Sequence, residues 1–539
     1  MLLLAPILAT CLLAQQQQVD LILDNGNILI MDRAFSKAAA IAIHQGKVVA
    51  TGDTATINRK YKATQRIDLK GRTAIPGFND AHTHITPRSR RAVVLTNATS
   101  IAEVKAEVAK KAAELGPGEW VSGGDWAEDK FKEGRILNRQ DLDEAAPNNP
   151  VALRRAGGHS SVSNSKALAI AGITRDTPQP DAGEIVHDAK GEPTGIIRER
   201  NDLVTKFIPP DTPAEQVVAL RTALRDQFRH GITSLINART NAADWPNWQA
   251  AYATQEDLPR AAVQILWSGK DKIQALGRKT GDGDDRLRLG AIKIFIDGGF
   301  TGRSGYTVEP YQGEKDFRGR LTVPRSALLE AFREAHALGW QLGVHTIGDR
   351  AAEIAVDLFE QVLKESPRQD HRHYLNHMSM RPPDHTYAKM KANNIWVTQQ
   401  PNFTYTLEPL YLEYIGKQRT ARAVPAKSLL DAGIFTAFSA DILPISPVIG
   451  LYAAVTRKGS SGAVHGPEEA VSIRQALECY TRNGAYFTRE EKIKGTLEPG
   501  MLADIAVLSK DPLKAAPEDI RTIEPDLVLL GGRKVYEKK

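Results

Sequence analysis

Two histidines, His82 and His84, lie one residue apart at the end of a short apolar run, Ala74–His84. If the run is a β-strand, both imidazoles point to the same side, because residues i and i+2 share a face. Neutral imidazole is a common ligand of zinc, iron and nickel. The pair therefore indicates half of a metal site, and two unrelated exposed side chains are the alternative interpretation.

Four further residues whose side chains could bind a metal or take part in catalysis lie within or at the end of other apolar runs. Lys293 lies inside Ala291–Phe295, where a charged ammonium is costly to bury. The structural alternative for this lysine is a salt bridge to Asp297 or another carboxylate. Three others each end a run: His345, His377 and Asp441. A plain helix N-cap is the alternative for the last of these.

The runs that carry these residues alternate with helical patterns, which is the signal of βα units and a parallel sheet. Besides the His82 run, we expect strands at Gly231–Asn237, Arg260–Trp267, Leu289–Asp297, Gln341–His345, His373–His377, Ile395–Gln399 and Phe435–Asp441. Helices are expected between them, for example at Pro213–His230, Arg325–Leu338 and Arg350–Glu365. This order predicts an α/β fold, a (β/α)8 TIM-like barrel, with its active site at the C-terminal strand ends.

Short strands and turns at both chain ends predict a small β-sandwich built from residues 19–74 and 495–539. Neither end has enough strands to bury a face alone, so the two are expected to pair. The barrel then spans residues 75–494. Within it, about residues 85–212 form a connection far longer than usual, which predicts a lid insertion after strand 1.

Composition limits the class of protein. The chain has 539 residues and a net charge of +6, and its basic and acidic residues are interspersed. This pattern gives no indication of a nucleic-acid partner. The two cysteines, Cys11 and Cys479, provide neither a disulfide framework nor a cysteine-built metal site.

The first residues resemble a secretory signal peptide, residues 1–14, followed by four glutamines. The basic segment usual in such peptides is missing, and Cys11 fits a lipoprotein cleavage site only loosely. The run is short for a bilayer span, and no later segment looks transmembrane. We therefore expect an exported protein, periplasmic or extracellular, in a soluble or lipid-anchored form and without an integral membrane span.

The ordered set of His-x-His, Lys, His, His and Asp resembles the amidohydrolase superfamily of metal-dependent hydrolases. More narrowly, it resembles the family labelled YtcJ-like or amidohydrolase 3. The resemblance covers nearly the whole mature chain. It is carried by Pro76–His84, Gly158–Ser160, Asn164–Leu168, Asp297–Gly299, His345–Arg350 and Gly495–Asp504.

Two positions depart from the family pattern. Asn376 stands where the family usually has a Glu before the strand-six histidine, and Ser439-Ala440-Asp441 stands where it often has Gly before a Ser-Asp pair. Neither departure removes a ligand. The first is expected to alter how His377 is held, because neighbouring hydrogen bonds orient a metal ligand.

The resemblance implies one or two divalent metal ions, with zinc as the expected metal. In the two-metal version, His82, His84 and Asp441 hold one ion, while His345 and His377 hold the other. Lys293 bridges the ions as a carbamate formed with carbon dioxide, because an ammonium cannot be a ligand. A single-metal site with unmodified Lys293 is the competing version.

A metal lowers the pKa of bound water to about 7, which provides hydroxide at neutral pH. We therefore predict an amidohydrolase in which metal-activated hydroxide attacks an amide-like carbonyl and Asp441 passes the proton to the leaving nitrogen. Expected substrates carry a non-peptide C–N bond, such as N-acyl or N-formyl amines or cyclic amides. The partner is thus a small molecule, and the sequence leaves a homo-oligomer open.

Other functions on the same scaffold stay open. A lactonase or esterase uses the same metals, as does a dipeptidase acting on acyl-amino acids. Deamination of aminopurines or cytosine is disfavoured, because related deaminases have a Glu three residues after the strand-five histidine and this chain has Gly348. A solute-binding protein that kept the barrel alone would have eroded ligands, and all six are present.

Residues outside the ligand set are predicted to contact substrate. His159 and Asn164 lie in the expected lid, and Asp297 lies near the mouth of strand four. Each has a structural alternative: a satisfied histidine, a local cap, or a carboxylate that orients a ligand or caps Gly298. The remaining histidines of the mature chain are predicted to be structural or exposed.

Overall fold

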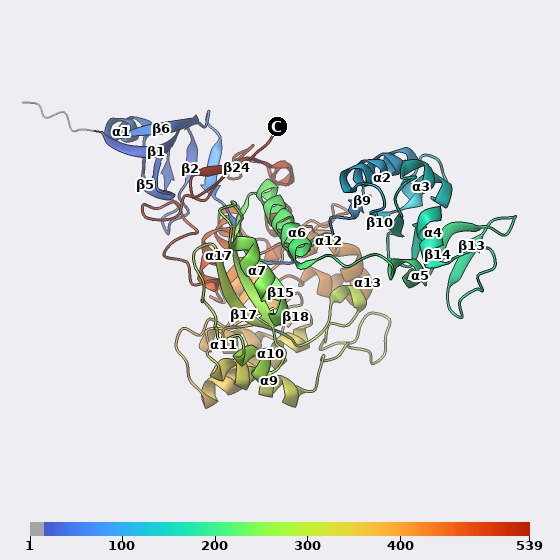
Figure 1. Cartoon of the computed structure of the whole chain (residues 1–539). Helices are drawn as coiled ribbons and strands as arrows, with labels where there is room; N and C mark the ends of the chain where they lie inside the picture. The colour runs from blue at the N-terminus through green and yellow to red at the C-terminus, as the bar shows by residue number, and fades with distance from the viewer. Residues whose placement is uncertain (1–15, 443) are drawn as a thin grey trace, which may run out of the picture. The chain divides into compact units, whose positions relative to one another are not determined.

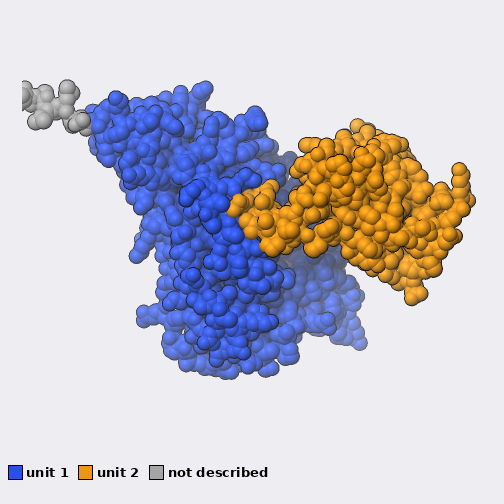
Figure 2. All heavy atoms as spheres, in the orientation of Figure 1, with its two compact units in different colours: residues 1–85, 224–539 blue, residues 86–223 orange. Residues whose placement is uncertain are grey.

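The computed structural model describes residues 16–442 and 444–539. The predicted signal peptide, residues 1–14, lies outside the described residues. The described chain forms two compact units (Figure 2): unit 1 contains residues 16–85 and 224–539, and unit 2 contains residues 86–223. No helix among the described residues combines the length and the apolar character that a membrane crossing needs.

Eight parallel strands form the central sheet of unit 1 (Figure 1). In spatial order they are β8 (Phe78–Thr83), β15 (Ile232–Thr240), β16 (Arg260–Leu266), β17 (Leu287–Phe295), β18 (Leu342–Thr346), β19 (Tyr374–His377), β20 (Trp396–Gln399) and β21 (Thr436–Phe438). A parallel bridge between Thr83 and Asp441 joins the two edges, so the barrel is nearly closed. The predicted TIM-like barrel is confirmed.

Helices follow the strands in the alternation that a parallel barrel requires. Those between or after its strands include α7 (Trp245–Tyr252), α8 (Lys270–Gln274), α9 (Arg325–Ala337), α10 (Asp349–Glu365), α11 (Asp384–Ala392), α14 (Ala426–Asp431), α15 (Pro447–Thr456), α16 (Ile473–Tyr480) and α17 (Arg482–Phe487). After β20 the chain also forms α12 (Asn402–Thr406) and α13 (Glu408–Ala421). In α10 the buried residues recur at helical spacing on one face, which explains why its apolar pattern predicts a helix.

The predicted first strand, Ala74–His84, is two strands rather than one. Residues Thr73–Pro76 form β7, which belongs to a different sheet, and the barrel strand β8 begins only at Phe78. Gly77 separates them, and a Cβ atom there would lie 2.2 Å from the Thr233 hydroxyl oxygen. A residue without a side chain is therefore needed where the chain passes from one sheet to the other.

Unit 1 has two smaller sheets, of which the second combines strands from both ends of the chain. One contains β5 (Lys47–Gly52), β4 (Ala40–His44), β1 (Gln17–Asp24) and β6 (Tyr61–Asp68), in that order. The other contains β24 (Arg533–Glu537), β23 (Pro525–Leu530), β22 (Ile505–Leu508), β7, β2 (Asn27–Leu29) and β3 (Lys37–Ala38). Leu23 and Ile41 of the first sheet share one buried cluster with Ile505 and Leu529 of the second.

Unit 2 has its own sheet and its own core. The sheet order is β13 (Glu184–His187), β14 (Pro193–Arg198), β12 (Ser160–Ser163), β11 (Ala152–Arg155), β10 (Ser122–Trp126) and β9 (Ala92–Val94). Helix α2 (Ile101–Leu115) begins with Ser100 as its N-cap and buries Val104 and Val108 in a cluster that includes Trp126. Further helices are α3 (Arg139–Ala145), α4 (Ser165–Ala171) and α5 (Asp202–Thr205), and the residues of α6 (Pro213–Arg225) begin in unit 2 and end in unit 1. The lid role and the exact domain boundaries stay predictions.

Candidate metal centre

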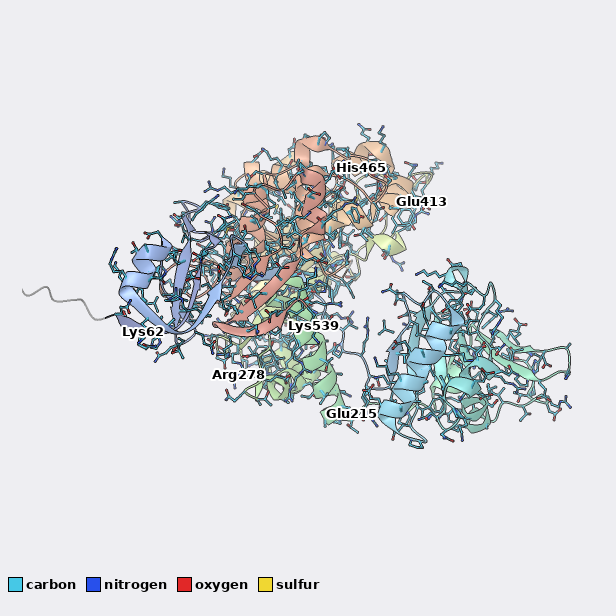
Figure 3. All side chains as sticks on the ribbon, turned by 90° about the horizontal axis from the view of Figure 1, so that it is seen from above. Lys62, Glu215, Arg278, Glu413, His465 and Lys539 are labelled. Atoms are coloured by element: carbon cyan, nitrogen blue, oxygen red, sulfur yellow. The ribbon has the colours of Figure 1, made fainter. Side chains whose placement is uncertain are left out.

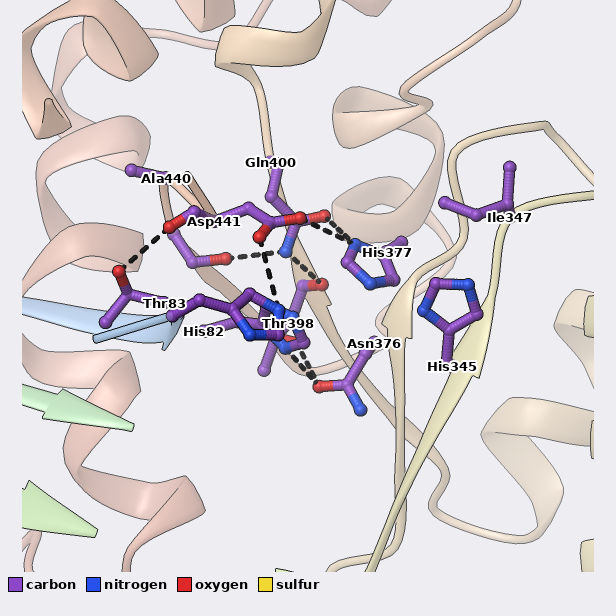
Figure 4. Close-up of polar contacts among 12 residues, drawn as sticks. His82, Thr83, His345, Ile347, Asn376, His377, Thr398, Gln400, Ala440 and Asp441 are labelled. Atoms are coloured by element: carbon purple, nitrogen blue, oxygen red, sulfur yellow. Dashed lines mark hydrogen bonds and ion pairs between the residues drawn. The ribbon is translucent and has the colours of Figure 1, made fainter. Parts of the chain in front are cut away.

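Three predicted ligands meet at the C-terminal ends of the barrel strands. His82 lies near the end of β8, His377 is the last residue of β19, and Asp441 follows β21. Their ligand atoms, one from each residue, all lie within 4.8 Å of one another, and both histidines are buried. Figure 4 shows the three side chains converging from separate strands. Such a group of donors can hold a cation.

The backbone that closes the barrel also positions Asp441. Its N–H donates to the carbonyl oxygen of His82 at 2.9 Å, and its own carbonyl accepts from the Thr83 hydroxyl at 2.8 Å. Asp441 has a φ of 57° and His377 a φ of 75°, in the left-handed region that non-glycine residues rarely adopt. Strained residues of this kind cluster at functional sites, where the surrounding structure holds them.

His84 and His345 lie on either side of this group. His84 Nε2 is 3.4 Å from Asp441 Oδ1. The ring centroid of His377 is 4.5 Å from that of His82 and 4.6 Å from that of His345. The four imidazoles therefore form one continuous cluster. It differs from the predicted two-metal grouping, because His377 lies with His82 and Asp441 as well as with His345.

Lys293 completes the set from β17. It is fully buried, and its Nζ lies 5.1 Å from the centroid of the Phe295 ring. That ring is in turn 4.9 Å from the His345 ring, because Phe295 and His345 are register partners on neighbouring strands. The structure thus brings all six predicted ligands to one end of the barrel.

Two neutral amides orient two of the histidines. His82 Nδ1 lies 2.7 Å from Asn376 Oδ1, and His377 Nδ1 lies 2.8 Å from Gln400 Oε1. An amide oxygen accepts, so each Nδ1 carries the proton and each Nε2 keeps its lone pair, which for His82 is the buried, unpartnered nitrogen that can bind a metal. The expectation that Asn376 alters how His377 is held is wrong. The Asn376 amide oxygen accepts from His82 Nδ1, and the Gln400 amide oxygen accepts from His377 Nδ1.

The atoms left without partners fit a metal ion. Among the described residues, His82 Nε2, His345 Nε2 and Lys293 Nζ are buried and have no hydrogen-bond partner. Buried polar atoms are nearly always paired, so unpaired ones call for an ion or a ligand. Imidazole nitrogens with a carboxylate oxygen are a donor set that suits zinc and other divalent transition metals. The residues present therefore fit the metal that the sequence implies.

Burial keeps the histidines in the neutral form that binds metals. It is the largest cause lowering the pKa of His82, His345 and His377 well below 6.5, and the charge of Lys293 adds to the effect. Burial also lowers the pKa of His84 to about 4. All four imidazoles are thus neutral at pH 7 without competition from protons.

Lys293 and Asp441 are shifted in opposite directions by the same cause. Burial lowers the pKa of the Lys293 ammonium, and the nearby Asp441 charge partly offsets this. Burial raises the pKa of the Asp441 carboxyl, and the Lys293 charge partly offsets that. Both groups therefore change protonation more easily near neutral pH than free side chains do. Such shifts in a cluster are typical of functional groups.

Asp297 has a structural role next to the site. It is fully buried and accepts hydrogen bonds from the backbone N–H groups of Tyr306, Ile347 and Gly348 at 2.8 to 2.9 Å. It thereby fixes the segment directly after His345. One of its oxygens also lies 3.9 Å from His345 Nε2. Its predicted contact with substrate stays a prediction.

Unit 2 carries the other two predicted substrate contacts. The side chain of His159 is 78% exposed, with Nδ1 3.0 Å from Glu199 Oε2. Asn164 is fully buried and caps α4 through Ala167, while its amide also binds Val151 and Asn149. Both substrate contacts stay predictions, and the structure already gives Asn164 a complete structural role.

Sequence reasoning missed two residues that shape the site. Asp80 is fully buried and accepts from the N–H groups of His82 and Ala440, so it ties the two edges of the barrel together. Burial raises its pKa to about 8. Gln400 directly follows β20, which is one of three barrel strands, with β15 and β16, for which the sequence predicts no functional residue. The rule that places functional residues at strand ends could have found it.

The histidines predicted to be structural or exposed lie outside the cluster of four imidazoles. They are His44, His187, His230, His336, His371, His373, His385 and His465. His465, labelled in Figure 3, is buried with its Nε2 2.5 Å from Glu408 Oε1. Its partner is thus a structural carboxylate.

A profile of the Amidohydrolase family matches residues 65–536, so the chain belongs to the amidohydrolase family and is a hydrolase. It is 30% identical over 532 residues to a protein of Bacillus subtilis (strain 168) named as an amidohydrolase, YtcJ, covering 95% of this chain and 98% of that one. It is 28% identical to an N-substituted formamide deformylase of Arthrobacter pascens, covering 97% and 99%. The predicted family is confirmed.

A solved structure has the same fold. An uncharacterized metal-dependent hydrolase from Pyrococcus furiosus superposes with a TM-score of 0.70 at 26% identity, covering 92% of this chain and all of that one. Because the match covers 92% of this chain, it includes residues of both unit 1 and unit 2. Family, fold and ligand cluster are therefore consistent with one another.

Proposed function

We propose that the protein is a metal-dependent hydrolase that cleaves a non-peptide amide C–N bond, such as that of an N-formyl or N-acyl amine or a cyclic amide. The observation that carries the proposal is the cluster of four neutral imidazoles, three of them buried, with Lys293 and Asp441 at the barrel mouth. The named activity of the Arthrobacter relative supports the formamide class.

The cation is proposed to be zinc, as one or two ions, held by His82, His84, His345, His377 and Asp441. A divalent cation there supplies Lewis acidity to a substrate carbonyl and acidifies water. We propose that Lys293 is carbamylated: its neutral amine adds to carbon dioxide and releases one proton, which converts a cation into a carboxylate ligand. The lowered pKa of its ammonium supports this step, because the neutral amine is the reactive form.

Asp441 is proposed to move the proton. Its side chain is 13% exposed, so it can face a bound substrate, and its raised pKa lets it accept and return a proton near neutral pH. It takes a proton from the attacking water and delivers it to the leaving nitrogen. Asn376 and Gln400 meanwhile hold the His82 and His377 rings in fixed orientations.

A substrate panel with metal analysis tests the proposal. The zinc-loaded protein is expected to hydrolyse formamides or acyl amides. Asp441→Asn is expected to lower kcat by about 100-fold or more while the protein stays folded. His345→Ala is expected to lose bound metal and activity together. The matched control is His385→Ala, an exposed histidine paired with Glu353, which is expected to keep both.

The same panel contains lactones and carboxylic esters. If these are turned over and amides are not, the protein is an esterase on this scaffold and the amide proposal is wrong. A folded protein that binds no metal and turns over nothing would support a solute-binding role instead. The chain is also proposed to be exported, which is tested by locating the mature protein and sequencing its N-terminus.

A further inference from the structure

Arg239 is an unpartnered cation at the end of a barrel strand. It is the penultimate residue of β15, and its side chain is exposed. Among the described residues, its guanidinium makes no ion pair and no hydrogen bond. Some other exposed arginines of unit 1 have a carboxylate partner, as Arg333 has Glu365 and Arg533 has Asp257.

The guanidinium faces the metal centre rather than bulk solvent alone. Its Cζ lies 5.8 Å from the centroid of Phe295, the ring that also contacts Lys293 and His345. Its positive charge is among the causes that lower the pKa values of His84 and Lys293. Arg239 and the ligand cluster therefore share one electrostatic environment.

The charges around this environment do not balance. Asp441 is the carboxylate that meets the imidazoles directly. The other two nearby, Asp80 and Asp297, are committed to backbone N–H groups. Against Asp441 and the proposed Lys293 carbamate stand Arg239 and, in the working protein, one or two divalent cations. An uncompensated cation beside a metal is unfavourable unless an anionic ligand is bound there.

We propose that Arg239 binds a carboxylate of the substrate, so that the preferred substrates are N-acyl or N-formyl amino acids rather than simple amides. A guanidinium offers two parallel N–H donors that match a carboxylate, which gives both affinity and orientation. The half-buried Phe295 ring beside it provides an apolar surface for the rest of the substrate. This inference rests on the proposed function and specifies its substrate class.

Two compounds that differ by one group test the inference. N-formylphenylalanine and N-(2-phenylethyl)formamide are identical except for the α-carboxylate. The zinc-loaded protein is expected to show a kcat/KM about 10- to 100-fold higher for the acid, the range of one charge-assisted hydrogen-bonded contact. The preference is expected to shrink with added salt, because the contact is partly exposed. Both enantiomers of the acid are assayed.

Variants assign the preference to this residue. Arg239→Gln is expected to reduce the acid-to-amide ratio of kcat/KM to near one, mainly through KM for the acid. Arg239→Lys is expected to restore part of the ratio, because the charge is kept and the paired donors are lost. Arg33→Gln is the matched control: Arg33 is exposed and lies in the turn between β2 and β3, and the ratio of this variant is expected to equal that of the wild type.

The outcomes separate this inference from the function beneath it. Hydrolysis of both compounds without preference for the acid, or a preference that survives in Arg239→Gln, overturns the inference and leaves the hydrolase proposal standing. An equal loss of both activities in Arg239→Gln also overturns it, because the residue then serves the metal centre itself. No hydrolysis of any amide by metal-loaded protein contradicts the proposed function instead.

Discussion

The neutral amides of Asn376 and Gln400 determine which nitrogen of two imidazoles carries the proton and which keeps its lone pair. Each accepts from an Nδ1–H at 2.7 to 2.8 Å, and Gln400 is itself fixed by donating to Ser439 Oγ at 2.8 Å. A carboxylate in the same place would make the ring more basic and the bound metal less electrophilic. The amides therefore favour a more acidic metal centre at the cost of affinity.

Removing one of these amides should weaken metal binding. Asn376→Leu leaves the His82 Nδ1–H buried and unpaired, so zinc affinity is expected to fall by about 10- to 100-fold. Competition with a chromophoric chelator measures this directly. The control is Asn483→Leu, which removes a buried amide that binds Thr436 at the start of β21. If both variants lose affinity equally, orientation of His82 is not the reason.

The ligands themselves were predictable from the sequence, and their supports were not. His82, His345, His377 and Asp441 each end an apolar run, so their position on a barrel follows from periodicity and chain order. Asn376 stands out only against the family pattern, which predicts an effect on its neighbour His377. Which side chain it meets depends on the curvature of the closed sheet, which no local pattern encodes.

At the scale of elements, Gly77 lets one continuous stretch of chain serve two sheets. Its N–H donates to Asp504 on the chain that enters β22, while the next residue begins the barrel. The ideal Cβ position lies 2.2 to 2.7 Å from three side-chain atoms of Thr233 on β15. This contact sets how closely β8 can approach its neighbour, and therefore where His82 and His84 emerge.

A side chain at position 77 should destabilise this junction. Gly77→Ala is expected to lower the free energy of unfolding by about 1–3 kcal/mol through overpacking. Thr233→Gly in the same chain should recover part of the loss, giving a favourable coupling in a double-mutant cycle. Gly52→Ala is the control, because its nearest neighbour would lie 3.8 Å from the new Cβ. Additive losses in the cycle would contradict the steric explanation.

The elements show where sequence reasoning works and where it stops. All eight barrel strands were predicted, because each is a short apolar run bounded by turns and separated from the next by helical patterns. The error at Ala74–His84 has a physical reason: both β7 and β8 are fully buried, so the apolar run continues across the boundary between sheets. A Pro-Gly pair inside the run was the available signal.

At the scale of the whole molecule, buried histidines occur at both ends of the barrel. Opposite the metal centre, His336, His371 and His373 form a network in which each ring has one donor and one acceptor nitrogen. His336 Nε2 donates to Ser366, His371 Nε2 donates to Asn393, and His373 Nδ1 accepts from the N–H of Leu342. His373 Nε2 also lies 2.9 Å from His336 Nδ1. Protonating any ring places a second N–H against a donor.

This network predicts how stability depends on pH. Burial is the main cause that lowers the pKa of His371 to about 4 and that of His373 well below 6.5, and the charge of Arg368 adds to it. The unfolded chain binds protons at these residues near pH 6.5, whereas the folded chain does not. The contribution of these histidines to the free energy of unfolding is therefore complete above pH 6.5 and is lost as the pH drops toward 4.

Urea unfolding of chelator-treated protein between pH 8 and pH 4 measures the slope of the free energy of unfolding against pH. Chelation removes metal binding, which would be a second cause of pH dependence. His371→Gln is expected to reduce the slope by about one proton between pH 6 and pH 4.5. Its amide can still donate to Asn393 and accept from the N–H of His373, so the fold is kept. An unchanged slope in His371→Gln would show that this histidine is not among the groups that titrate on unfolding.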